Sequence, residues 1–144
     1  MERARDVSGF RILDHPADLG IEAWGSSLNQ AFEQAALGLI SVILNPQMVN
    51  AREQRSIRLE AADDHQLLVK WLTEILYLYD GDRFVATQFK IASLSGPRLE
   101  AVVGGEAFDP DRHETRLDVK AITYHQLQIS QSPERSSLQV FLDI

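Results

Sequence analysis

Acidic side chains occur at two places far apart in the chain. Asp14 and Asp18 flank His15 in the segment Leu13–Gly25, and Asp143 precedes the last residue, Ile144. Two carboxylates and an imidazole in a Pro-containing turn can bind a cation, take part in acid/base chemistry or cap the turn. Aspartate and proline are ordinary turn formers, so the first segment taken alone is most typical of a simple turn. The carboxylates of Asp143 and the chain end at Ile144 add weight to cation binding and acid/base chemistry.

The strand pattern around these residues predicts which way the aspartates point. Side chains alternate along a strand, so Asp143 faces away from the apolar Leu138, Val140 and Leu142. If the strand after Asp18 lies beside this last strand, the two aspartates share one layer. Like charges about 5 Å apart repel by about 3 kcal/mol at an effective dielectric near 20. Such a pair requires a cation or a proton, and oxygen ligands favour Ca²⁺ or Mg²⁺ over zinc.

Lys120 is the second candidate. Thr115–Ile129 alternates as one long strand or a bulged pair, with Leu117, Val119 and Ala121 on the apolar face and Lys120 on the polar face. Two interpretations stay open: a solvated strand lysine paired with Asp118, or a cation poised near the carboxylates or presented to a partner.

The histidines give weaker signals. His125 falls on the apolar face of the same predicted strand, which favours a hydrogen-bonded core residue. His65 and His113 fall in polar surroundings and are expected at the surface. His15 can serve as a metal ligand, but no second histidine stands at metal-ligand spacing.

Composition excludes several function classes. The chain has 144 residues, a net charge of −7 and no cysteine, which rules out a disulfide framework and a thiolate zinc site. An acidic chain is a poor non-specific nucleic-acid binder and suits a cation or a basic protein surface. Walker, GxGxxG and G-x-S-x-G motifs are absent. No apolar run is long enough to cross a membrane and no secretory signal is evident, so a cytoplasmic location is expected.

The hydrophobic periodicity predicts two helices among about seven strands. Ser27 and Gln30 form a capping box before a helix that ends at Asn45-Pro46, and Asp63 or Asp64 caps a second helix that ends near Gly81. The remaining pattern alternates as strands, expected at Phe10–Leu13, Leu19–Trp24, Ser56–Ala61, Phe84–Leu94, Leu99–Val103, Thr115–Ile129 and Leu138–Ile144. We therefore expect one α+β domain over residues 1–144, with a mainly antiparallel sheet and both helices on one of its faces.

Several segments taken together resemble the archease family. The similarity covers nearly the whole chain in order, although Pro16 stands where the family more often has threonine. The matching segments are Leu13–Gly25, Ser27–Ala36, Trp71–Tyr77, Gly105–Asp109, Val119–His125 and Leu142–Ile144.

The resemblance implies a protein that is not itself an enzyme. Archeases activate RtcB-type RNA ligases in tRNA splicing and RNA repair, promoting guanylylation and multiple turnover, and carry a divalent cation that is taken to be calcium. When the family's metal ligands are assigned to the matching motifs of this sequence, they are Asp18, Asp143 and the main-chain carboxylate of Ile144. The ion is then Ca²⁺ or Mg²⁺. Lys120 matches a lysine needed for activation. RNA is then contacted only indirectly, through the ligase.

Two other hypotheses compete with this one. The first is a metal-dependent hydrolase using Asp14, Asp18 and Asp143, which needs open metal positions and a base near bound water. Only His15 stands near enough in sequence to supply such a base. The second is an RNA-binding module, which needs a basic surface that the composition does not provide.

Overall fold

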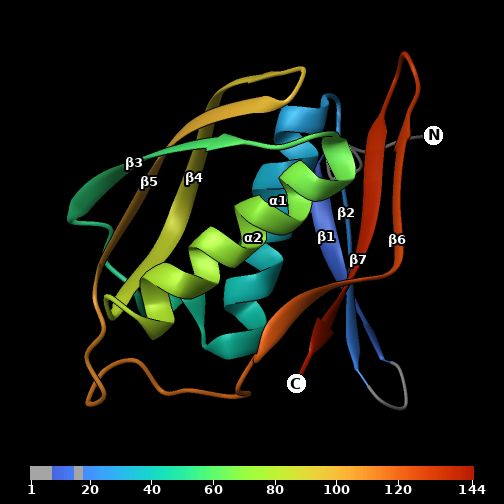
Figure 1. Ribbon diagram of the computed structural model, residues 1–144. Coiled ribbons are helices and arrows are strands. Elements are labelled where there is room, and N and C mark those ends of the chain that lie inside the picture. The colour runs from blue at the N-terminus through green and yellow to red at the C-terminus, as the bar shows by residue number, and fades with distance from the viewer. Residues whose placement is uncertain (1–7, 15–17) are drawn as a thin grey trace.

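The computed structural model describes residues 8–14 and 18–144, and its strands form two antiparallel sheets (Figure 1). The first sheet has the order β1-β2-β7-β6 and the second the order β3-β5-β4. The strands are β1 Gly9–Asp14, β2 Leu19–Gly25, β3 Glu53–Glu60, β4 Phe84–Ser95, β5 Arg98–Ala107, β6 Ala121–Gln131 and β7 Ser136–Asp143. The predicted α+β class with antiparallel strands is confirmed, and the strands divide between two sheets.

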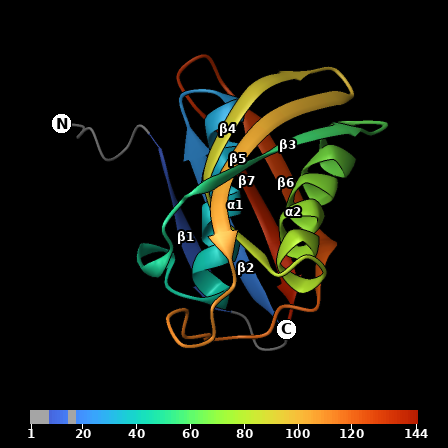
Figure 2. The same cartoon turned by 90° about the vertical axis from the view of Figure 1, so that its left-hand side faces the viewer.

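Both helices lie between the sheets (Figures 1 and 2). Helix α1, Leu28–Ile43, packs on β1, β2 and β7 from one sheet and on β4 from the other. Helix α2, Asp64–Asp80, packs on β6 from one sheet and on β3 and β4 from the other. Each helix therefore has two apolar contact surfaces, and each sheet turns its second face away from the helices.

Local sequence sets where the helices begin. The Ser27 hydroxyl accepts a hydrogen bond from the main-chain N–H of Gln30 at 3.3 Å, and the Gln30 side chain accepts one from Ser26 N–H at 2.8 Å. Asp63 plays the same part for α2, accepting from Gln66 N–H at 2.8 Å. These bonds satisfy N–H groups that have no partner within the helix, so the predicted caps are confirmed.

The core fills the space around the two helices. Trp71 of α2 is fully buried and donates its indole N–H to the main-chain oxygen of Phe32 in α1 at 2.9 Å. The carboxylate of Glu33 accepts the main-chain N–H of Ile91 in β4 at 2.8 Å, which fastens α1 to the second sheet. Among the described residues, no helix is long and apolar enough to span a membrane.

The predicted strand Thr115–Ile129 is wrong in its first part. Strand β6 begins at Ala121, and residues 108–120 form a crossover loop that leads from β5 in the second sheet to β6 in the first (Figure 2). Of the residues expected on the apolar face, Val119 is buried, whereas Leu117 and Ala121 are exposed. Ile122, expected beside Lys120 on the polar face, is buried.

Candidate functional site

Three chain segments bring the predicted site residues to one end of the first sheet. Asp18 immediately precedes β2, Asp143 is the last residue of β7, and Lys120 immediately precedes β6. Strand β7 lies between the other two: Leu142 pairs with Leu19 of β2, and Asp143 pairs with Ala121 of β6. In Figure 1 the C-terminus accordingly lies near the beginning of β6. The neighbouring strands that a shared carboxylate layer requires are therefore present.

These residues differ in exposure. Asp18 is half-buried and its Oδ1 atom is shielded from solvent, whereas Asp143 and Lys120 are exposed and Ile144 is 36% exposed. The main-chain N–H of Lys120 donates to the main-chain oxygen of Asp143 at 2.7 Å. This bond fixes the backbone of the lysine beside the backbone of the terminal aspartate and leaves the Lys120 side chain open to solvent.

Asp14 lies at the same end of the first sheet, on its outer strand β1. It is exposed, ends β1 and pairs with Leu19. Its neighbours in the predicted turn, His15 and Pro16, lie outside the described residues. Within residues 8–14 and 18–144, no three or more His, Cys, Asp or Glu side chains gather where they could hold a metal ion. Within these residues the Asp14, Asp18 and Asp143 side chains are therefore not gathered into one three-carboxylate cluster.

The predicted pairing of Lys120 with Asp118 is also absent from the described part of the chain. Asp118 lies near the carboxyl of Asp80 at the end of α2 instead. Burial raises the pKa of Asp80, the charge of Asp118 raises it further, and the charge of Arg83 acts in the opposite direction. Within residues 8–14 and 18–144, the Lys120 ammonium therefore forms no ion pair with Asp118.

The crossover loop is tied to the end of α1 before it reaches Lys120. Thr115 forms a bridge with Leu44, and the main-chain N–H of Arg116 donates to Ile43 O at 2.7 Å. The Arg116 guanidinium also donates to the main-chain oxygen of Ser41 at 2.9 Å. Val119, the residue before Lys120, is buried in the core. The position of Lys120 thus depends on contacts made by the whole loop.

A buried carboxylate fixes the other end of the same loop. Glu106, 5% exposed in β5, accepts hydrogen bonds at 2.8 Å from Asn50 N–H, from the Arg112 guanidinium and from His113 Nε2. His113 Nδ1 accepts the main-chain N–H of Asp109 at 2.9 Å, so Nε2 carries the ring proton that is donated to Glu106. Three donors from two segments therefore converge on one carboxylate.

The electrostatics of this group favour the ionised form. Burial of Glu106 opposes ionisation, but the hydrogen bonds from Asn50, Arg112 and His113, with the charge of Arg112, outweigh it and lower the pKa to about 2. A carboxylate that accepts several hydrogen bonds is held strongly in its charged form. Glu106 therefore acts as an ionised structural anchor for the crossover loop at neutral pH.

Two histidine predictions are wrong. His113, expected at the surface, is 1% exposed. The turn at Pro110 folds it back so that its ring is hydrogen bonded to Glu106. His125, expected in the core, is exposed, and its ring edge lies against Phe141 with the ring centres 6.0 Å apart. His65 is exposed at the start of α2, as predicted. Arg112 and His113, six and seven residues after Glu106, were the sequence signal that could have revealed the anchor.

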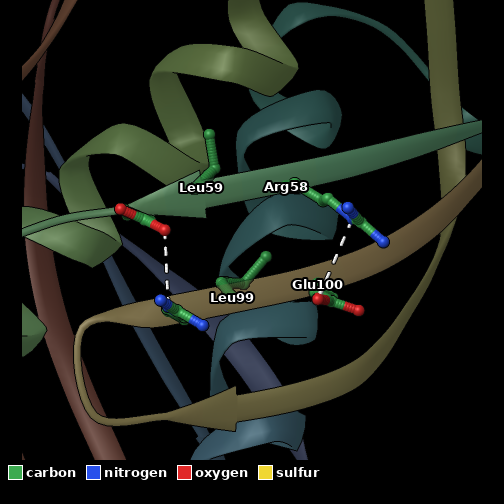
Figure 3. A pocket seen from close by; sticks show the side chains of 6 residues that line it. Arg58, Leu59, Leu99 and Glu100 are labelled. Atoms are coloured by element: carbon green, nitrogen blue, oxygen red, sulfur yellow. Dashed lines mark ion pairs between the residues drawn. The ribbon is translucent and has the colours of Figure 1, made fainter.

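A surface pocket of about 380 Å³ lies on the second sheet, away from the site residues (Figure 3). Arg58 and Glu60 of β3 form ion pairs with Glu100 and Arg98 of β5, at 3.8 and 3.3 Å respectively. Leu59 and Leu99 complete its lining. The charged side chains that shape this pocket are thus already paired with each other across the two strands.

Comparison with known proteins decides the family. The family model of the Archease protein family matches residues 10–144. This chain belongs to the archease family. It is 37% identical to Protein archease of Sulfolobus acidocaldarius over 139 residues, which cover 96% of this chain and all of that protein. It is 40% identical to Protein archease of Pyrococcus furiosus over 124 residues, covering 84% and 87% of the two chains.

Solved structures show the same archease fold. A solution structure of a Methanobacterium thermoautotrophicum protein matches with a TM-score of 0.81 at 32% identity, covering 94% of this chain and 99% of that one. A Thermotoga maritima crystal structure, described as an archease and possible chaperone, matches with a TM-score of 0.64 at 16% identity and covers 93% and 96%. The second likeness concerns the fold alone.

Proposed function

We propose that this chain activates an RtcB-type RNA ligase, promoting its guanylylation and repeated turnover in tRNA splicing or RNA repair. The observation that carries the proposal is the convergence of Asp18, Asp143, Ile144 and Lys120 at one end of the first sheet. These are the residues that the resemblance to archeases assigns to metal binding and activation. Membership of the archease family supports the same role, and a net charge of −7 suits a basic protein partner.

In this proposal Asp18, Asp143 and the main-chain carboxylate of Ile144 hold Ca²⁺ or Mg²⁺. The donor set is made of hard oxygens, which such ions prefer, and the shielded Oδ1 of Asp18 lies at the end of the strand beside Asp143. A bound ion offsets the repulsion between carboxylates and keeps the strand ends together. Lys120 remains exposed beside them to contact the ligase.

The direct test combines the purified chain with an RtcB-type ligase, GTP and Mn²⁺ and follows guanylylation of the ligase. We expect substoichiometric amounts to accelerate guanylylation, because an activator acts by transient contact. An unchanged rate at every ratio of the two proteins contradicts the proposal. Hydrolysis of RNA or phosphoesters by the chain alone, lost on Asp18→Ala, supports the hydrolase in its place.

Asp143→Asn is expected to weaken Ca²⁺ binding at least about tenfold, because it removes one of few charged ligands. Binding by the wild type is expected toward the millimolar end of protein sites. Isothermal titration calorimetry measures both affinities. Glu134→Gln, an exposed carboxylate in the β6–β7 turn, is the control for the loss of one negative charge. Equal affinities for the wild type and Asp143→Asn count against the ligand assignment.

A further inference from the structure

Strand β6 contains a β-bulge beside the proposed site. Thr123 pairs with Phe141 and Gln128 pairs with Gln139, so residues 124–127 stand opposite the single residue Val140. Gln126 has a φ of 51°, in the left-handed region that residues other than glycine rarely adopt. A bulge of this kind interrupts the regular alternation and redirects the side chains it carries.

Specific contacts hold the bulge in one conformation. The Gln139 side chain donates to the main-chain oxygen of Gln126 at 3.0 Å, in place of a ladder bond. The Thr123 hydroxyl donates to Phe141 O at 3.0 Å and accepts the main-chain N–H of His125 at 3.2 Å. A residue keeps a strained backbone conformation only when its contacts hold it there. These hydrogen bonds therefore make the bulge a defined part of β6.

Phe141 connects the bulge to the carboxylates. Its ring contacts His125 on one side, and a Cβ at Gly20 would lie 2.9 Å from the ring, so the ring lies directly over Gly20. Phe141 and Asp143 are two residues apart in β7 and therefore share one face of the sheet. His125, the bulge residue that Phe141 contacts, therefore lies on the same sheet face as Asp143.

The bulge also exposes an aromatic side chain. Tyr124 is 56% exposed, although it belongs to a strand whose inward residues are packed against α2. A tyrosine supplies a large apolar surface and a hydroxyl at little conformational cost, and tyrosines are enriched among the residues that dominate binding energy in protein interfaces. The neighbouring carboxylates favour a partner with Lys or Arg side chains, which also bind aromatic faces.

We propose that the 124–127 bulge is a docking element for the ligase and that Tyr124 is its principal contact. This inference rests on the proposed function and names a surface through which the partner is held. The occupant is a protein surface that presents basic side chains. Tyr124 packs against that surface, and the exposed Lys120 and Asp143, at the neighbouring end of β6 and β7, extend the contact.

Tyr124→Ala tests the proposal against a matched control, Tyr77→Ala. Tyr77 is also exposed, at 70%, but it lies on α2. We expect Tyr124→Ala to weaken ligase binding by about tenfold or more and Tyr77→Ala by less than about twofold. Tyr124→Phe keeps the ring and should retain most of the affinity. Surface plasmon resonance gives the affinities, and melting temperature and Ca²⁺ titration should match the wild type for all three variants.

Deletion of residues 124–126 provides a second variant. It removes the positive φ at Gln126 and restores one-to-one pairing between β6 and β7, so the circular dichroism spectrum should persist while ligase binding is lost. If the deletion variant does not fold, Tyr124→Ala decides the question.

Three outcomes are distinguishable. A wild type that neither binds nor activates the ligase refutes the proposed function itself. A wild type that activates, with Tyr124→Ala equal to it in affinity, refutes the docking element alone. RNA binding by the isolated chain that is lost in Tyr124→Ala also overturns it, because the bulge then contacts nucleic acid by base stacking.

Discussion

Lys120→Ala is expected to abolish most of the ligase activation while leaving the protein folded. The side chain is exposed and forms no ion pair with Asp118, so its removal should change the free energy of unfolding by less than about 0.5 kcal/mol. For a chain of this size that corresponds to a shift in melting temperature of about 2 °C or less. The backbone bond from Lys120 N–H to Asp143 O does not depend on the side chain and should persist.

The measurement is the initial rate of ligase guanylylation with wild type and variant at equal concentration. We expect a reduction of about tenfold or more, as for loss of a charged group at an interface centre. Lys90→Ala is the matched control, because Lys90 is an exposed strand lysine on β4 in the other sheet. If Lys120→Ala activates the ligase normally, Lys120 has no part in activation and is only a solvated surface lysine.

Glu106→Gln is expected to cause the largest loss of stability, about 3 kcal/mol at pH 7. The variant removes the charge that pairs with Arg112 at 2.8 Å and alters the hydrogen bonds from Asn50 and His113. Urea unfolding followed by circular dichroism measures the difference. Glu60→Gln is the control: its carboxylate is paired with Arg98, but 72% of the side chain is exposed, so we expect a change below about 1 kcal/mol.

The stability difference between the wild type and Glu106→Gln should depend on pH, and it should decrease as the pH falls. The pKa of Glu106 is lowered in the folded protein to about 2, whereas an unfolded glutamate titrates near its ordinary value of about 4.3. Its stabilising contribution is complete above the unfolded pKa and is lost as the pH falls toward about 2. The gap between wild type and Glu106→Gln should therefore be constant from pH 7 to about pH 5 and shrink below that. A gap that does not shrink between pH 5 and pH 3 contradicts the assignment.

The helices and their caps were predictable because their signals are local. Ser27 with Gln30, and Asp63 with Gln66, carry their capping bonds within four residues. The strands beside the site were predicted for the same reason, since alternation is visible within each strand. That Asp18 and Asp143 lie on neighbouring strands was not predictable from periodicity, because it depends on the order of strands in the sheet.

The errors arose where distant contacts override a local pattern. Leu117 and Val119 alternate as a strand would, but the segment is fixed by hydrogen bonds from the Arg116 main chain and guanidinium to the end of α1. His113 has polar neighbours in sequence, which suggests the surface. It is buried because its ring is hydrogen bonded to the buried carboxylate of Glu106. His125 was assigned to the wrong environment because the bulge at residues 124–127 breaks the two-residue period on which the assignment depended.

The position of β7 between β2 and β6 has a consequence for biosynthesis. Leu19 pairs with Leu142 and Gly25 pairs with Ser136, so the β1–β2 hairpin cannot join its sheet until β7, more than 100 residues later in the chain, has been made. Contacts of such high contact order form slowly, and strand edges left unpaired in the meantime are prone to aggregation. The second sheet uses only residues 53–107 and does not need β7. A released chain that ends before Ser136 should therefore carry a second sheet that resists limited proteolysis, beside a first sheet that is not complete.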